Sequence, residues 1–297
     1  MPVWRGYSWL APLSLSLIEK HWPNHPEMWF CGLDSEQSAE LPCIPLSGSE
    51  DRSNWSTVLK SGIAGMKEKG FDAVYLIAEE HVPLQACHVE HLNETLPTLM
   101  QSLQAVYISL MGWDNRRYVS RSPCLGKVQH QLKHLVGKND PRFHLHPALW
   151  SLEILEVCCD VALADKGKNG SAWHFEKSCE SVDSALPAMA KSSCYQIRAS
   201  TLSLTRKSTW QSAVEWGERF FYHKLMAFYP LISRTRIGAK VARKIPFDDV
   251  FCDGPYPMFF SGIMAKGKLN KHCVRFLARH NKPLLNRILE TIPNGRV

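Results

Sequence analysis

The sequence lacks several patterns that would assign it to a simple class. Its ten cysteines form no C-x-x-C pair, which argues against a zinc ribbon or a dithiol redox motif; adjacent Cys158 and Cys159 suggest small buried thiols. The most apolar N-terminal run, residues 7–18, is too short to span a bilayer, and no small-residue cleavage site follows it. These features predict a protein of the reducing cytoplasm, with at most peripheral contact with the inner face of the membrane.

Repeats, low-complexity tracts and recognised nucleic-acid-binding modules are also missing. What the chain does have is a large aromatic content, with ten Trp, twelve Phe and eight Tyr in 297 residues. Such a composition excludes intrinsic disorder, and the length permits one large α/β domain or two smaller ones with an ample core.

Acidic residues are scarce in the last third of the chain. Residues 198–297 contain 18 basic and 6 acidic side chains, whereas the first 197 residues contain 17 basic and 22 acidic ones. The overall charge of +7 therefore conceals a strongly basic C-terminal region. This asymmetry indicates a polyanionic partner, which leaves nucleic acid, an anionic membrane or the phosphates of a nucleotide as alternatives.

Hydrophobic periodicity predicts alternating helices and strands. Helices are expected over 10–20, 53–69 with Ser53 as the N-cap, 88–101, 152–163 and 208–229. Strands are expected over 27–33, 41–46, 71–78, 105–111, 143–150 and 195–204. The alternation favours βαβ units and a mainly parallel sheet.

The predicted strand 71–78 ends in Glu79, Glu80 and His81. Ligands of open α/β sheets bind at the carboxyl ends of strands, and carboxylates at that place can hold Mg²⁺ or Mn²⁺ together with substrate phosphates. An ordinary polar loop leaving a strand would have the same composition.

The segment Trp173-His174-Phe175-Glu176 places a carboxylate beside two aromatic side chains. Desolvation beside the aromatic rings would raise the pKa of Glu176 and suit it to act as a general base. The aromatic faces could carry a sugar ring. Alternatively, Glu176 is simply an acidic residue in the first turn of a helix.

Two histidine pairs and a basic run are weaker candidates for further sites. His130 and His134 have the spacing of a helical metal pair, and His144 and His146 would share one face of a strand, but neither pair has the supporting Cys or carboxylate spacing of a zinc site. The basic run 234–244 could follow nucleic-acid phosphates or anionic lipid, or form a solvated face.

The order of several segments resembles a bacterial branch of the GT-A-fold glycosyltransferases that is associated with polysaccharide biosynthesis. The similar segments are Tyr7-Ser8-Trp9-Leu10 running on to Lys20-His21-Trp22-Pro23, Asn54-Trp55-Ser56, Tyr75 to His81, Leu145 to Trp150 with Ser171 to Glu176, and Ser261 to Lys268. Each segment is short, and their combined order is more specific than any one of them.

The resemblance implies an α/β, Rossmann-type fold with a mainly parallel or mixed sheet flanked by helices and a helical C-terminal elaboration. It implies a catalytic, nucleotide-sugar-binding domain over 1–204 and a basic extension over 205–297 that packs on it. The activity implied is transfer of a sugar from a nucleotide-sugar donor to a hydroxyl of a carbohydrate or lipid-linked acceptor.

Site residues are carried over from the resemblance by position. Glu79, Glu80 and His81 would hold a divalent cation, Mn²⁺ or Mg²⁺, and Glu176 would deprotonate the acceptor in an inverting reaction. The residues expected to contact substrate are Asn54, Trp150, Trp173 and His174. The strongly basic C-terminal region, rather than the resemblance, supplies the residues expected to cover the diphosphate, which are Arg234, Arg236, Lys266 and Lys268. Two alternatives stay open, namely an inactive binding or scaffold protein of this fold and a basic nucleic-acid-binding protein.

Overall fold

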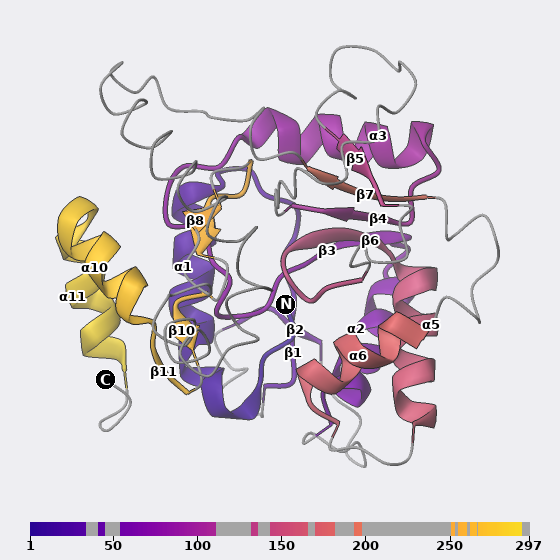
Figure 1. Cartoon of the computed structure of the whole chain (residues 1–297), viewed down its shortest axis with the longest axis horizontal. Coiled ribbons are helices and arrows are strands. Elements are labelled where there is room, and N and C mark those ends of the chain that lie inside the picture. Colours follow the sequence, from indigo (N-terminus) through magenta and orange to yellow (C-terminus); the bar gives the residue numbers. More distant parts are fainter. Residues whose placement is uncertain are drawn as a thin grey trace, which may run out of the picture.

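A computed structural model describes residues 1–33, 41–44, 54–110, 132–135, 143–165, 170–181, 193–197, 251–252, 255–259, 262–265 and 267–292. Within these ranges the chain forms a mixed α/β structure around one five-stranded sheet (Figure 1). The strands of this sheet are β3 (Ala73–Leu76), β4 (Tyr107–Ser109), β5 (Leu132–His134), β6 (Ala148–Ser151) and β7 (Cys194–Ile197). The predicted α/β class is confirmed at this level.

The sheet has the order β3-β6-β4-β7-β5, and its neighbours are mostly antiparallel. Within this described sheet, only β4 and β7 pair in parallel, whereas β6 runs antiparallel to both β3 and β4, and β5 runs antiparallel to β7. The sheet is therefore mixed, which is one of the two forms expected, whereas the expectation of a mainly parallel sheet is wrong. The physical reason is the insertion of β6, a strand from later in the chain, between two strands that point the same way.

The position of β6 between β3 and β4 decides which chain segments meet at the carboxyl ends of the strands. Leu76 at the end of β3 and Ser109 at the end of β4 both pair with Ala148 at the start of β6. The carboxyl ends of β3, β4 and β7 consequently lie at the same edge as the loop that precedes β6. We call this edge the site edge.

Side chains alternate between the two faces of the sheet along each strand, and helices cover both faces. Tyr107 and Trp150 pack on one face, with α2 (Trp55–Glu68), α5 (Leu152–Ala164) and α6 (Ala172–Ser181). Their neighbours Ile108 and Leu149 pack on the other, with α1 (Ala11–His21), the π-helix η2 (His91–Thr95) and α3 (Leu96–Ser102). This period of two is what a strand with both faces buried requires. Figure 1 shows the resulting three-layered arrangement.

Helix α2 begins one residue later than predicted. Asn54, rather than Ser53, is its N-cap, and the Asn54 side-chain oxygen accepts hydrogen bonds from the backbone N–H groups of Ser56 and Thr57. The backbone N–H of Trp55 donates to the carbonyl of Gly170, 2.7 Å away. These bonds fix the start of α2 beside the segment that leads into α6.

A small parallel sheet and a 3-10 helix lie at the N-terminal end of the chain. Strand β1 (Phe30–Cys31) pairs with β2 (Cys43–Ile44), and Pro2 forms an isolated parallel bridge to Cys31. The 3-10 helix η1 (Arg5–Leu10) leads directly into α1.

The C-terminal elements pack against α1. They are the hairpins β8 (Phe251–Cys252) with β9 (Met258–Phe259) and β10 (Met264–Ala265) with β11 (Lys268–Leu269), and the helices α10 (Lys271–His280) and α11 (Lys282–Thr291). Leu13 and Leu17 of α1 share a core cluster with Leu277 and Ile288. The predicted helix 208–229 and the basic run 234–244 lie outside the described residues. Among the residues that are described, no helix is long and apolar enough to cross a membrane.

Candidate functional site

The strand β3 leads into a tight turn at Glu79, Glu80 and His81, at the site edge. The backbone N–H of His81 donates to the carbonyl of Ala78, 3.0 Å away, which closes the turn. The position of these three residues beyond the carboxyl end of a strand agrees with the sequence prediction, but their side chains play different parts.

The side chain of Glu79 is buried in the protein interior. It is 1% exposed, and its Oε1 accepts a hydrogen bond from the backbone N–H of Trp4 at 3.0 Å. Burial, reinforced by the neighbouring charge of Glu80, raises the pKa of Glu79 well above its usual value. Glu79 is thus buried and holds the N-terminal segment through Trp4, whereas Glu80 is partly exposed. The divalent-cation site at Glu79, Glu80 and His81 stays a prediction.

The raised pKa of Glu79 predicts a pH-dependent stability difference from Glu79→Gln. Ionising the buried carboxyl costs more in the folded than in the unfolded chain, so the wild type loses this part of its stability as the pH rises from about 4.3 toward the folded pKa. The amide that replaces the carboxyl cannot ionise, and we expect the variant to gain stability relative to the wild type as pH rises. Urea unfolding at pH 5 and pH 8 measures the change, with exposed Glu27→Gln as a control. A difference that is the same at both pH values would contradict the prediction.

The turn is covered by a C-terminal segment around Gly262. The backbone N–H of Ile263 donates to the carbonyl of Glu80 at 2.8 Å, and the hydroxyl of Tyr256 donates to the carbonyl of His81 at 3.0 Å. Asn270 holds this segment through a bond from its Nδ2 to the carbonyl of Gly262. Segments about 180 residues apart in the sequence therefore meet at the acidic turn.

The loop before β6 brings two more imidazoles to the same edge. The predicted strand begins only at Ala148, so His144 and His146 lie in this loop and not on a strand face. Phe143, which has a positive φ of 61°, anchors the start of the loop by stacking on Trp150 at 5.4 Å. The ring of His146 lies 5.1 Å from the ring of buried His81, which connects the loop to the end of β3.

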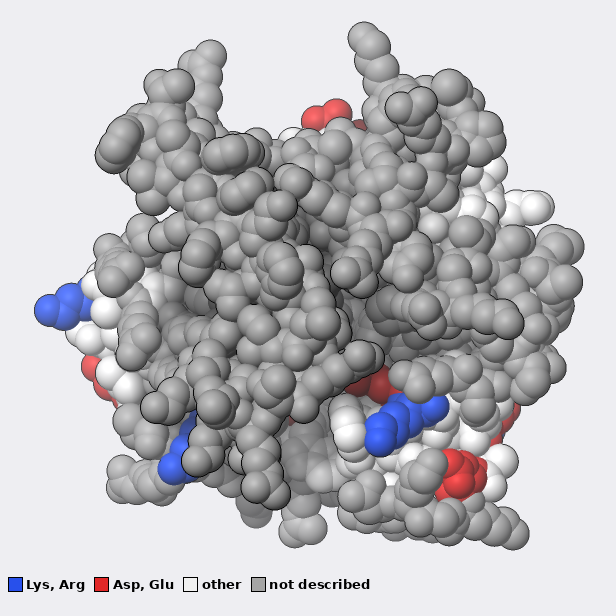
Figure 2. Space-filling view, in the orientation of Figure 1, with Lys and Arg blue, Asp and Glu red and all other residues white. Residues whose placement is uncertain are grey.

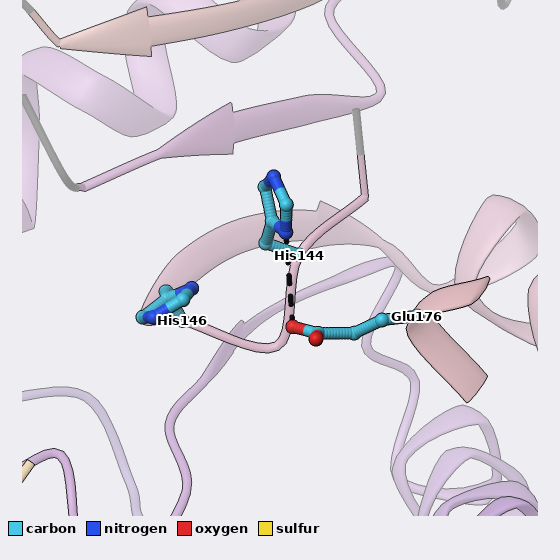
Figure 3. A group of neighbouring side chains, drawn as sticks. All are labelled: His144, His146 and Glu176. Carbon is cyan, nitrogen blue, oxygen red and sulfur yellow. Dashed lines mark ion pairs between the residues drawn. The ribbon is translucent and has the colours of Figure 1, made fainter. Parts of the chain in front are cut away.

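Glu176 projects from α6 toward this loop (Figure 3). Its Oε1 accepts a hydrogen bond from the backbone N–H of Leu145 at 2.9 Å and lies 3.7 Å from Nδ1 of His144. Burial opposes ionisation of Glu176, but the hydrogen bond from the backbone N–H of Leu145 and the nearby imidazoles of His144 and His81 outweigh it, so the pKa of Glu176 lies below its usual value. The expectation of a raised pKa is thus wrong, because polar partners surround the carboxylate instead of aromatic rings.

The residues expected to bind substrate differ in their exposure to solvent and in their contacts. Trp173 is 66% exposed on α6, one helical turn from Glu176. Trp150 is 0% exposed and lies among aromatic core residues, so it cannot touch a substrate. His174 is buried with its ring beside Ser178, and the Asn54 oxygen is used in capping α2. For these last three the structural contacts replace the predicted role.

The expected phosphate-binding cations are only partly described. Arg234, Arg236 and Lys266 lie outside the described residues, and Lys268 is exposed on β11. On the face shown in Figure 2, the described Lys and Arg side chains are separated from one another, and some lie beside Asp or Glu. The described part of that face therefore carries no continuous basic patch.

His144 and His146 were not predicted to be members of the site. Their His-x-His spacing was visible, but the pairing partner Glu176 is 30 residues away and on a different element. Proximity of this kind depends on the antiparallel insertion of β6, which periodicity does not reveal.

Comparisons of the chain with protein-family models, with curated proteins and with solved structures found no match.

Proposed function

We propose that the chain is a glycosyltransferase with a GT-A-like fold, which moves a sugar from a nucleotide-sugar donor to a hydroxyl acceptor. The observation that carries the proposal is the convergence at the site edge of three segments that resemble the family separately. The turn Glu79–His81, the loop and helix around Glu176, and the closing segment at Gly262 contact one another or a shared neighbour. Ligands of α/β sheets bind at such an edge.

Glu176 is the proposed base. Its carboxylate is ionised at neutral pH, as that of an ordinary glutamate is, and its side chain remains 24% exposed to an incoming acceptor. In the proposed step the acceptor oxygen forms a bond to the anomeric carbon while the bond to the nucleoside diphosphate breaks, and the hydroxyl proton passes to Glu176. His144 and the N–H of Leu145 orient the carboxylate. No step depends on a metal at Glu79 and Glu80.

Trp173 is the proposed stacking surface for a sugar ring. The indole is exposed, lies one turn from Glu176, and is held by Lys177, whose Nζ lies 3.8 Å from the ring centroid. We expect Trp173→Ala to raise the KM for substrate about tenfold, equivalent to about 1.4 kcal/mol, with little change in stability because the side chain is on the surface. Phe71→Ala, which removes another exposed aromatic residue, is the matched control for steady-state kinetics. Equal KM values for wild type and Trp173→Ala would remove this assignment.

The proposal is tested by thermal unfolding in the presence of UDP-, GDP-, CMP- and dTDP-sugars, with and without added Mg²⁺ or Mn²⁺. A donor at about 100 times its Kd stabilises the folded state by about 2.7 kcal/mol, which raises Tm by several degrees. A donor that does so is then assayed for nucleoside diphosphate release with candidate hydroxyl acceptors. Stabilisation without transfer to any acceptor would favour the inactive binding protein. No stabilisation by any donor, together with salt-dependent binding of RNA or DNA, would favour the nucleic-acid-binding alternative.

A further inference from the structure

Three side chains at the site edge surround a common space. His144, His146 and Glu176 each offer one ligand atom, and these atoms lie within 4.8 Å of one another. Figure 3 shows that the two imidazoles come from the loop before β6 and the carboxylate from α6. All three residues are partly exposed, so an ion from solvent can reach them.

The backbone around these side chains is held in place independently of any ion. The N–H of Leu145, between the two histidines, donates to Oε1 of Glu176 at 2.9 Å. At the end of the loop, the carbonyl of Pro147 accepts a bond from the N–H of Leu110 at 2.9 Å. Contacts behind the ligands that fix their orientation are typical of metal sites and strengthen binding.

The chemistry of these three ligand atoms favours some divalent cations over others. Two neutral imidazoles and one carboxylate suit Zn²⁺ and its transition-metal neighbours, whereas Mg²⁺ and Ca²⁺ prefer oxygen ligands alone. In a tetrahedral zinc site the ligand atoms are about 3.3 Å apart, which follows from metal–ligand distances of about 2.0–2.1 Å. Side-chain rotations that close the gaps by up to about 1.5 Å would reach this geometry. Three protein ligands would leave one coordination position open to solvent.

We infer that His144, His146 and Glu176 form a binding site for one divalent transition-metal ion of the zinc type. The site differs in its residues and in its ligand chemistry from the acidic turn at Glu79 and Glu80. If the proposed function holds, one consequence follows: a carboxylate bound to zinc is not available to take a proton, so zinc at this site inhibits sugar transfer.

Isothermal titration of the chelator-treated full chain with ZnCl₂ tests the site without any nucleotide sugar. We expect one ion per chain, and about tenfold weaker binding or more for His146→Ala and for Glu176→Gln. His25→Ala, which removes an imidazole from a partly exposed loop outside the site, is the matched control and is expected to bind zinc as the wild type does. Thermal unfolding without metal establishes that each variant is folded.

Cobalt supplies a measurement that needs no variant. Co²⁺ bound by two imidazoles and a carboxylate gives visible d–d bands without the near-ultraviolet charge-transfer band of a cobalt–thiolate bond, which separates this site from the cysteines. A thiolate band, the absence of stoichiometric zinc binding, or undiminished binding in both variants would overturn the inference. Zinc binding in a chain that transfers no sugar would contradict only the proposed function, whereas transfer without zinc binding would contradict only the metal site.

Discussion

Glu176→Gln is expected to lower the turnover number of sugar transfer by a factor of about 10²–10⁴, the usual contribution of a positioned general base. The amide cannot accept the proton of the acceptor hydroxyl. Its oxygen can still accept the hydrogen bond from the N–H of Leu145, which the carboxylate accepts at 2.9 Å. The substitution therefore removes the ability to accept a proton and largely keeps the position of the side chain.

Donor binding should survive this substitution. The carboxylate of Glu176 contacts the loop at His144 and Leu145, and the proposed acceptor side of the site, so the rise in Tm produced by a nucleotide sugar should be close to that of the wild type. Steady-state rates of nucleoside diphosphate release, measured in a metal-chelating buffer and again with Mg²⁺, give the turnover number.

Glu153→Gln provides the matched control for this experiment. Glu153 is an exposed carboxylate in the first turn of α5, and it takes no part in the described site. We expect its turnover to equal that of the wild type. A Glu176→Gln variant with near-normal turnover would mean that another group, or the acceptor alone, removes the proton.

The local elements of the fold were predictable because their signals are contained in short windows. The helix that became α2 shows apolar residues at helical spacing, and the strand that became β3 is nearly continuous in β-forming residues. The strand was predicted over 71–78 and forms over Ala73–Leu76, so its end lies two residues before the one indicated by the change from apolar residues to Glu79, Glu80 and His81.

Pairing between strands was not predictable in the same way. Nothing within residues 143–151 indicates that β6 enters the sheet between β3 and β4 and runs antiparallel to both. That pairing decides which side chains meet, and it explains why His144 and His146 were left out of the predicted site. It also explains Trp150, whose position in the register places it opposite Val74 and Tyr107 in the core.

Individual side-chain roles were the least predictable property of the site. Glu79 and Glu80 are neighbours in sequence, yet one carboxyl is buried against the N–H of Trp4 and the other residue is partly exposed. For Glu176, the expected desolvation is present, but the carboxylate turns toward His144 and Leu145, whose effect on the pKa is larger in sum. Both outcomes depend on contacts with residues far away in the sequence.

Gly262→Ala is expected to destabilise the folded chain by about 3 kcal/mol, because two separate costs combine at this position. Gly262 has a φ of +69°, which disfavours any residue with a Cβ atom. A Cβ built there would also lie 2.6 Å from the backbone oxygen of Glu80, and backbone cannot move aside as a flexible side chain can. Relief of that contact would displace the bond from the N–H of Ile263 to the same oxygen.

The variant Gly267→Ala separates the conformational cost of a positive φ from the cost of the steric contact. Gly267 has a φ of +81° but nothing within 4 Å of the position that a Cβ would take, so its substitution should cost only the conformational part, about 1 kcal/mol. Urea unfolding of the two variants under the same conditions gives the difference, about 2 kcal/mol, which we assign to the contact with Glu80. Because the bond from the N–H of Ile263 to the carbonyl of Glu80 holds the closing segment on the acidic turn, and the clash would displace it, Gly262→Ala should also reduce donor-induced stabilisation, whereas Gly267→Ala should preserve it. Equal costs at the two glycines would show that the closing segment does not press on Glu80, and the convergence that carries the proposed function would lose one of its three segments.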